Sequence, residues 1–270
     1  MNTIQKYLKL YIKEFHIPLN NGLEFWPPYL RNDNHAEVGN TVPRGLGKAS
    51  PEEIRMSAEY ILTLFPTITA QEIRNKLIDG SLPEAGMNYK GIDCSGFVFY
   101  VMDGLYKKLF SKSLTTDLAV PKAQVLNGAY NFLEWRAAHK LTDIEEFNIP
   151  DNVPVDWVVD TFHRKPVNLC GVSSLVSDYS SCAVDVYNCR PSDLLHVKVK
   201  NDPIPHLAIV TDVKPYTLTV IHSGRKDPHD SGGILTETIP RTNSTIDTLA
   251  LTVPREFLGI RRLKSLAEHV

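Results

Sequence analysis

The sequence predicts an α+β fold, with helices in its first half and an antiparallel sheet in its last third. In the first half, apolar residues recur every three or four positions, which is the spacing of one buried helix face. From Pro191 onward they alternate with polar residues in short runs, and turn residues separate the runs. This alternation predicts an antiparallel sheet of about five or six strands, the usual size for a sheet.

The composition is that of an ordinary globular protein. The 270 residues are 43% hydrophobic and 22% charged, with a net charge of −2, which fits one large domain or one domain with an appendage. No basic run indicates a nucleic acid partner. No apolar stretch approaches the roughly 18 residues of a membrane span, and the lysine-broken start lacks a signal-peptide apolar region. We therefore expect no membrane span, and either a cytoplasmic location or export without a leader.

The four cysteines are Cys94, Cys170, Cys182 and Cys189. None of them forms a C-x-x-C pair, so we expect no zinc site and no other metal site. Four cysteines in a chain of this length are too few for a disulfide scaffold. A bridge between two of the last three stays open.

Residues 1–80 are predicted to form a helical N-terminal extension. Residues 1–15 have one apolar face, and two further helices begin with capping boxes, in which an N-cap hydroxyl and a glutamate three positions later satisfy each other's backbone N–H groups. The boxes are Ser50 with Glu53 and Thr69 with Glu72, and Gly80 ends the last helix.

A further helix is predicted to begin at Cys94. Asp93 is a natural N-cap, and apolar residues recur from Phe97 to Leu109. The helix start favours an anion, so the Cys94 thiol is expected to have a lower pKa than a free thiol and to form a thiolate. The alternative is that Cys94 is a small buried apolar residue, the commoner fate of a free cysteine.

The strands follow a stretch of mixed pattern. Residues 121–140 are predicted to be helical, and residues 141–189 follow no clear period. His139 and His163 lie in this region and, like His16 and His35, are expected to have no catalytic role. The expected strands are residues 195–200, 206–213, 216–222, 232–239, 248–253 and 257–263.

The hairpin between the second and third strands carries two histidines. A turn centred on Lys214 makes the numbers of opposite residues add up to 428, which places His206 directly opposite His222 on one face. With Cys94 they supply the groups for nucleophilic acyl chemistry: a thiolate, an imidazole base and an orienting group. We expect His206 to be the base, His222 to fix its tautomer, and the N–H of Cys94 to stabilise an oxyanion.

At these residues the sequence resembles the NlpC family of papain-like cell-wall cysteine peptidases. The motif Asp93-Cys94-Ser95-Gly96-Phe97-Val98 is similar to the nucleophile motif of that family. The later similar segments follow in the family's order, and they are Pro191-Ser192-Asp193-Leu194, His206-Leu-Ala-Ile-Val, Val220-Ile-His222-Ser and Gly259-Ile-Arg261-Arg262-Leu263.

The resemblance implies a papain-like core in residues 81–270, with a helical insertion at about 111–188. It implies hydrolysis of amide bonds in peptidoglycan stem peptides or muropeptides, commonly between D-γ-glutamate and a diamino acid, without metal or cofactor. It also implies that Asp93 and Ser95 bind the substrate, with Tyr89 as the nearest tyrosine to act as an oxyanion donor. Two alternatives stay open: an amidase or acyltransferase for another acyl substrate, and a binding module of the same fold without turnover.

Overall fold

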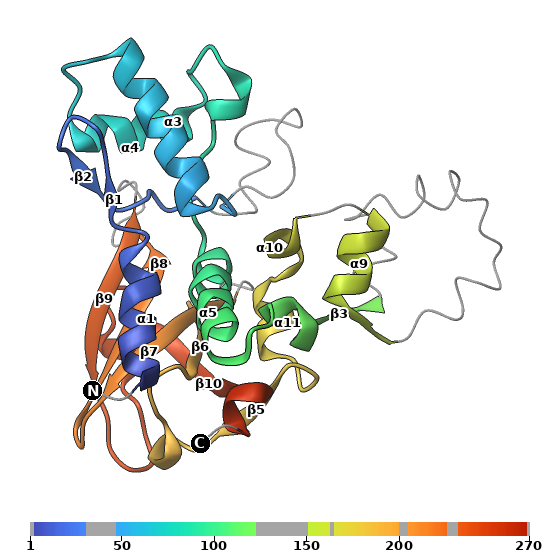
Figure 1. Ribbon diagram of the computed structural model, residues 1–270. Helices are drawn as coiled ribbons and strands as arrows, with labels where there is room; N and C mark the ends of the chain where they lie inside the picture. The colour runs from blue at the N-terminus through green and yellow to red at the C-terminus, as the bar shows by residue number, and fades with distance from the viewer. Residues whose placement is uncertain are drawn as a thin grey trace.

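The computed structural model describes residues 3–30, 47–122, 151–162, 165–199, 205–225 and 232–268. The fold is α+β, with a six-stranded antiparallel sheet packed against a helix, as the sequence predicts (Figure 1). None of the helices in these residues is long and apolar enough to cross a membrane.

The sheet has the strand order β5-β10-β6-β7-β8-β9. Five of the predicted strands are confirmed to within about two residues, and a sixth, β5, was not predicted. The bounds are β5 Ser181–Val184, β6 Leu194–Val199, β7 Pro205–Val213, β8 Thr217–Gly224, β9 Gly233–Pro240 and β10 Arg255–Leu263.

The predicted strand at residues 248–253 is wrong. Thr248–Ala250 form a short 3-10 helix, because the Asp247 carboxylate caps the N–H of Leu249 and the Thr248 hydroxyl donates to the carbonyl of Arg255 at 2.8 Å. These local hydrogen bonds compete with strand pairing.

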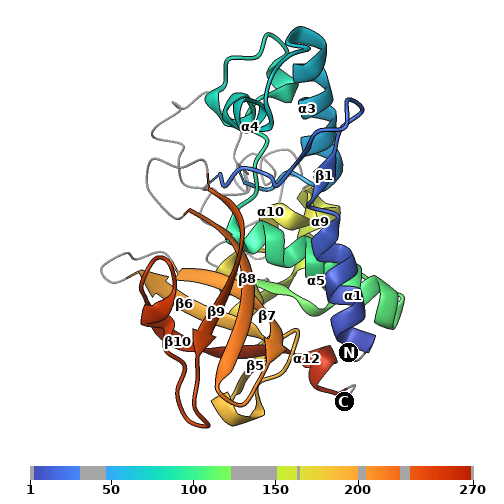
Figure 2. The same ribbon diagram turned by 90° about the vertical axis from the view of Figure 1, so that its left-hand side faces the viewer.

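Helix α5, Cys94–Phe110, packs against one face of the sheet at β7 and β8. Helix α1, Thr3–Lys13, lies beside α5 on the same side of the sheet (Figure 2). Leu8 and Phe15 share one buried core with Phe97 of α5 and Leu207 of β7. The first helix therefore belongs to the main core in its packing.

Helices α3, Pro51–Leu64, and α4, Ala70–Asp79, form a second helical layer with its own apolar core, beside the short strands β1, Ile17–Pro18, and β2, Glu24–Phe25. Both predicted capping boxes are confirmed, and so is the end of α4 at Gly80, which has a φ of 70°. Figure 1 shows this layer above the sheet.

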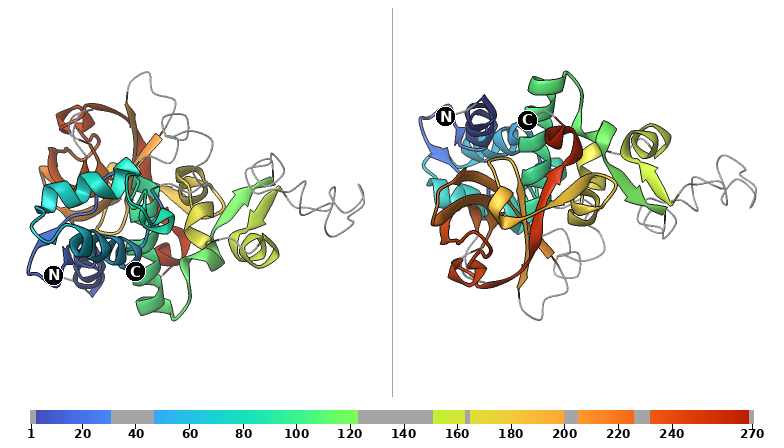
Figure 3. Two further views of the ribbon diagram at one scale, coloured as in Figure 1. Left: turned by 90° about the horizontal axis from the view of Figure 1, so that it is seen from above. Right: turned by 90° about the horizontal axis from the view of Figure 1, so that it is seen from below.

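The segment between α5 and β6 adds short elements, and the part made of residues 119–121 and 151–162 projects to one side (Figure 3). Most of the predicted helix at residues 121–140 lies outside the described residues, and Pro121 itself ends a strand. The elements are the 3-10 helices Leu114–Asp117 and Val186–Asn188, the paired strands β3 Ala119–Pro121 and β4 Asn152–Pro154, and the helices α9 Val155–Phe162, α10 Pro166–Leu169 and α11 Val172–Val176. A short helix α12, Lys264–Ala267, and the 3-10 turn Ala85–Met87 complete the fold.

Candidate active site

Cys94 is the first residue of α5, as predicted. The Asp93 carboxylate caps the helix by accepting the N–H of Gly96 at 2.6 Å, and Lys107 and Lys108 lie in the last turn. The Cys94 side chain is buried, with 7% of the residue exposed. The sulfur therefore lies at the helix start but in surroundings with little water.

The expected low pKa of Cys94 is wrong for the substrate-free protein. Burial, followed by the nearby Asp93 carboxylate, raises the pKa of the thiol to about 11. The N–H of Leu207 and the charges of Lys48 and Arg255 act in the opposite direction but do not outweigh burial. Cys94 is therefore a neutral thiol at neutral pH.

The predicted hairpin register is also wrong, by two residues. The numbers of the opposite partners Ile209 and Ile221 add up to 430 rather than 428. His222 therefore lies two residues along β8 from the position directly opposite His206. A displacement of two keeps both side chains on one face, because side chains alternate between faces with a period of two.

The two imidazoles are in direct contact. His206 Nε2 lies 2.9 Å from His222 Nδ1, and the ring planes are nearly perpendicular, at 87°. Both residues are buried. The histidines are therefore joined by a hydrogen bond across neighbouring strands, which is the relation expected for a base and its orienting group.

Glu237 on β9 extends this pair, and the sequence analysis did not find it. His222 Nε2 lies 2.7 Å from Glu237 Oε1, and the N–H of Thr252 donates to Oε2 at 2.5 Å. Glu237 pairs with Val220, which lies two residues before His222 on β8. Glu237 therefore lies on the same face of the sheet as His222. The only signal in the sequence is an acidic residue in the strand after His222, which identifies a partner only when the register is known.

The carboxylate fixes the proton positions along the chain. Burial alone would raise the pKa of Glu237, but the hydrogen bonds from His222 and Thr252 lower it to about 2. Ionised Glu237 accepts only, so His222 Nε2 carries a proton, and we assign Nδ1 of His222 as the acceptor in its bond with His206. His206 then donates from Nε2, which leaves its Nδ1 as the basic nitrogen.

The sulfur reaches β7 next to His206. Leu207 faces α5, whereas His206 opposes Val197 in the core on the other face of the sheet. The N–H of Leu207 is hydrogen-bonded to the sulfur, and the Arg255 charge lowers the pKa values of both Cys94 and His206. Among the described residues, no hydrogen bond joins Cys94 and His206. Catalytic hydrogen bonds are often long or poorly aligned before substrate binds.

Burial is the main reason why the pKa of His206 lies well below its ordinary value, with the charge of Arg255 and the neighbouring His222 acting in the same direction. His206 is therefore neutral at neutral pH and able to accept a proton. Cys94 and His206 are therefore both neutral at neutral pH, which differs from the thiolate that the sequence predicts.

Two predicted substrate-binding residues lie beside Cys94. Asp93 Oδ1 and Ser95 Oγ both accept from the Lys48 ammonium, at 2.8 and 2.5 Å. The chain's own amine thus occupies the polar groups that the resemblance assigns to the substrate. Their role in substrate binding stays a prediction.

Tyr89 packs against the end of α4. A Cβ built on Gly80 would lie 2.2 Å from the Tyr89 hydroxyl, so the two residues are in close contact. Tyr89 also has a positive φ of 57°. Its predicted role as an oxyanion donor has no contact in support of it here and stays a prediction.

Gly224 and Ser223 at the end of β8 shape the surroundings of the histidines. A Cβ built on Gly224 would lie 2.9 Å from His222 Nδ1, so the absence of a side chain leaves room for the ring. The Ser223 hydroxyl donates to the carbonyl of Ile92 at 2.6 Å. This bond ties the histidine strand to the loop that precedes Cys94.

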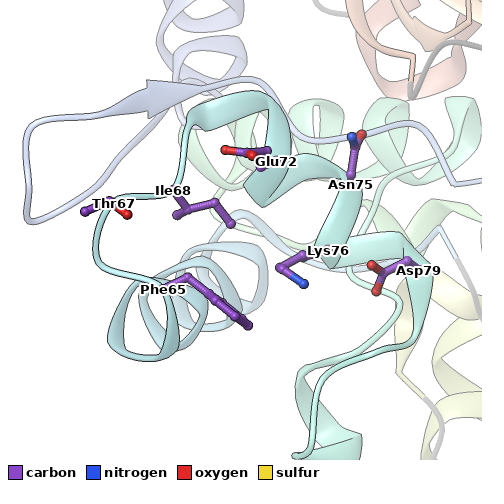
Figure 4. Close-up of a pocket in the computed structure, with 7 residues that line it drawn as sticks. All are labelled: Phe65, Thr67, Ile68, Glu72, Asn75, Lys76 and Asp79. Carbon is purple, nitrogen blue, oxygen red and sulfur yellow. The ribbon is translucent and has the colours of Figure 1, made fainter.

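The remaining cysteines and a pocket elsewhere on the molecule do not add to this site. Cys170, Cys182 and Cys189 are free thiols, and the described ranges hold no group of three or more His, Cys, Asp or Glu that could bind a metal ion. A cavity of about 400 Å³ lies on the helical layer, between Phe65 at the end of α3 and Asp79 on α4 (Figure 4). Lys76 lies 4.4 Å from the Phe65 ring within it.

Comparisons of the chain with protein-family models, with curated proteins and with solved structures gave no match.

Proposed function

We propose that the protein is a papain-like cysteine peptidase that hydrolyses amide bonds in peptidoglycan stem peptides. One observation carries the proposal: a chain of hydrogen bonds from Glu237 through His222 to His206, which ends next to the amide that holds the Cys94 sulfur. A buried imidazole with a fixed tautomer, beside a thiol at a helix start, is the arrangement that acyl transfer through a thioester needs.

The mechanism starts from neutral Cys94 and neutral His206. Nδ1 of His206 takes the thiol proton as the Cys94 sulfur attacks the amide carbonyl carbon. The N–H of Cys94 stabilises the oxygen that becomes negative. The C–N bond then breaks, the leaving amine takes the proton from His206, and a thioester remains. His206 next deprotonates a water molecule, whose oxygen attacks the thioester carbon. The C–S bond then breaks, the sulfur takes the proton back from His206, and the acid is released.

The hydrogen-bonded partners of His206 allow it to accept a proton and to donate it again in both steps of the reaction. The positive charge that develops on His206 is shared with His222, and ionised Glu237 lies 2.7 Å from the far nitrogen of His222. A preorganised charge of opposite sign favours the protonated state of the relay in a site with little water. Proton transfer therefore accompanies attack, which suits a thiol with a pKa of about 11.

The substrate class rests on the resemblance of the Asp93 to Val98 motif and of the later strand motifs to the NlpC family. The bond between D-γ-glutamate and a diamino acid is the first one to test. An amidase or acyltransferase for another acyl group would use the same relay, and a different acyl substrate would reveal it.

Digestion of purified muropeptides, followed by mass spectrometry, tests the proposal. The wild-type protein is expected to add one water and to release a peptide with a new amine. Cys94→Ala is expected to abolish this release, and His206→Ala to reduce it at least about 100-fold, the usual contribution of general acid–base catalysis. Cys182→Ala is the matched control, because Cys182 is a free, half-buried cysteine on β5, and its rate is expected to equal that of the wild type.

A binding module without turnover is the second candidate, and the burial of Cys94 favours it. A thiol that is 7% exposed, with a pKa of about 11, is also what an inert structural cysteine shows. Intact muropeptides after prolonged digestion, together with a retained complex in equilibrium dialysis, would support this candidate and reject the peptidase.

A further inference from the structure

Lys48 places a buried ammonium group beside the proposed nucleophile. Its side chain is 3% exposed, and Nζ lies 2.8 Å from Asp93 Oδ1 and 2.5 Å from Ser95 Oγ. Asp93 and Ser95 are the two neighbours of Cys94 in the chain. The ammonium is thus bonded to both residues that flank the sulfur.

The backbone around Lys48 is fixed against the same loop. Lys48 forms an antiparallel bridge with Ile92, and the N–H of Asp93 donates to the carbonyl of Gly47 at 2.7 Å. The Tyr100 hydroxyl of α5 donates to the Lys48 carbonyl at 3.1 Å. Both ends of Lys48 are therefore held against the start of α5.

Gly47 makes this close approach possible. Its φ is +73°, and a Cβ built there would lie 1.9 Å from the carbonyl oxygen of Leu30 and 3.0 Å from the Asp93 Cβ. No side chain fits in this space, and glycine adopts the positive φ without strain. The backbone at Gly47 thus fixes the position of Lys48 beside Asp93.

Helix capping alone does not explain a charged pair at this place. An uncharged Asn or Ser caps a helix about as well as Asp. A buried ion pair also costs desolvation energy, which its own attraction often does not recover. The Asp93 carboxylate works against a second negative charge on the adjacent sulfur, whereas the Lys48 ammonium favours that charge.

We propose that Lys48 is a positioning residue of the candidate active site, whose ammonium balances the Asp93 carboxylate and so allows negative charge to form on the Cys94 sulfur. Among the described residues, the other charged group that acts on this sulfur is Arg255 from β10, and the titratable His206 of β7 lies next to Leu207 in the chain. The inference rests on the proposed function for its purpose, but the charge balance is measured on the thiol itself.

The test is a charge cycle on the 270-residue chain, with iodoacetamide as the probe. The Cys94 thiolate displaces iodide from the reagent, and the rate is followed from pH 6 to 11 by peptide mass, which separates Cys94 from the other three cysteines. The variants are Lys48→Met, Asp93→Asn and the double variant. Asn keeps an acceptor oxygen for the N–H of Gly96, so the helix cap survives in Asp93→Asn.

The expected results have opposite signs. Lys48→Met leaves the carboxylate unbalanced and is expected to slow alkylation about tenfold at a given pH below the thiol pKa, equivalent to a rise of about one in that pKa. Asp93→Asn is expected to speed alkylation by a similar factor. The double variant is expected to return close to the wild-type profile.

Two results would overturn the inference. One is an unchanged pH profile in both single variants. The other is a change of the same sign in both, with a larger change in the double variant, as loss of packing would produce. Circular dichroism at each pH identifies unfolding of Lys48→Met, and in that event Asp93→Asn decides by its sign. Muropeptide cleavage with a flat charge cycle refutes the Lys48 role alone, and a clear cycle without cleavage refutes the peptidase alone.

Discussion

The charge state of Cys94 is set by its burial more than by the helix that it begins. The rise of the thiol pKa from 9.0 to about 11 corresponds to about 3 kcal/mol against the thiolate. The first turn of a helix typically offers an anion only about 0.3–1 kcal/mol. In the proposed mechanism, groups that act at the moment of attack, such as His206, must therefore supply most of the activation.

Glu237 is predicted to stabilise the fold in a pH-dependent way. Its pKa is about 2 in the folded protein against an ordinary value of 4.5. The stabilisation is therefore complete above about pH 4.5 and is lost as the pH falls towards 2. Glu237→Gln is expected to lower the free energy of unfolding by about 1–3 kcal/mol at pH 7, the usual range for a charged hydrogen bond.

Urea denaturation of the wild type and Glu237→Gln at several pH values measures this effect. The difference between the two proteins is expected to narrow below pH 4.5. Glu256→Gln is the control, because the Glu256 side chain is 53% exposed and its ion pair with Lys198 is expected to contribute less than about 1 kcal/mol. A difference for Glu237→Gln that stays constant down to pH 3 would contradict the assignment.

At this scale the sequence predicts positions better than environments. Cys94 at a helix start and two histidines on one face follow from local patterns. The pKa of Cys94 does not, because it depends on the sheet that buries the sulfur. The contact of Lys48 with Asp93 was not predictable for a similar reason: the two residues are 45 positions apart in the chain, and no periodicity marks such a contact.

At the scale of single elements, the turn before β6 contains local strain at Ser192. This residue has a φ of 83°, and its buried hydroxyl has no hydrogen-bond partner among the described residues. Ser192→Gly is expected to stabilise the protein by about 1 kcal/mol. Removal of left-handed strain gives about 1–2 kcal/mol, and the added freedom of glycine in the unfolded chain takes back about 0.5–1.

Thermal and urea unfolding of Ser192→Gly, beside Ser192→Ala, separate the two causes. Ala removes the unpaired hydroxyl but keeps Cβ, so the difference between Gly and Ala measures the backbone strain. We expect Gly to be the more stable of the two. A less stable Gly variant would show that the positive φ carries no strain here.

The end of β8 is predicted to tolerate no side chain at Gly224. Its Cβ would lie 2.9 Å from His222 Nδ1, so Gly224→Ala must displace that ring and break the 2.9 Å bond to His206. If the proposed function holds, muropeptide turnover is expected to fall at least about tenfold, because the proposed base His206 loses its orienting group. The imidazole N–H signals in proton NMR are expected to shift as well, and they report the bond without any substrate.

Gly86→Ala is the matched control for this substitution, since nothing lies within 4 Å of its Cβ position. It is expected to leave both turnover and the imidazole signals unchanged. Unaltered imidazole signals in Gly224→Ala would mean that the ring can accommodate the methyl group, and the geometric argument would then fail.

Elements with local signals were predictable, and those made by distant pairing were not. Each capping box of α3 and α4 involves residues within a span of four positions, and the structure contains both boxes. Strand β5 contains only four residues and exists because β10 pairs with it. The hairpin turn is centred between Pro215 and Tyr216 rather than on Lys214, because Val213 pairs with Leu218. An irregularity between Val210 and Asp212 then moves the pairing back by one, and neither feature is visible in the alternation.

At the scale of the whole molecule, Asp193 joins three strands of the sheet. It precedes β6, its backbone carbonyl accepts the N–H of Val210 on β7 at 2.8 Å, and its carboxylate binds Arg262 of β10. His206, His222 and Glu237 lie on β7, β8 and β9 of the same sheet, whereas the hydrogen bonds of Asp193 join β6, β7 and β10. Loss of this tie is therefore expected to destabilise the fold as a whole.

Arg262→Met is predicted to be strongly destabilising, and its neighbour provides the comparison. Arg262 forms two hydrogen bonds to Asp193, at 2.7 and 2.8 Å, and the Asp193 side chain is fully buried. Removing one partner of a buried pair usually costs about 3–5 kcal/mol, because the other charge stays buried without compensation. Arg261 instead pairs with Asp178, whose side chain is 98% exposed, and also donates to the hydroxyl and the carbonyl of Ser181. Its ion pair is expected to contribute about 1 kcal/mol or less and its neutral hydrogen bonds about 1 kcal/mol each, so Arg261→Met is expected to cost less than Arg262→Met. Urea unfolding followed by circular dichroism measures both. Equal losses in the two variants would mean that the Asp193 tie contributes no more than the exposed ion pair and the Ser181 hydrogen bonds of Arg261.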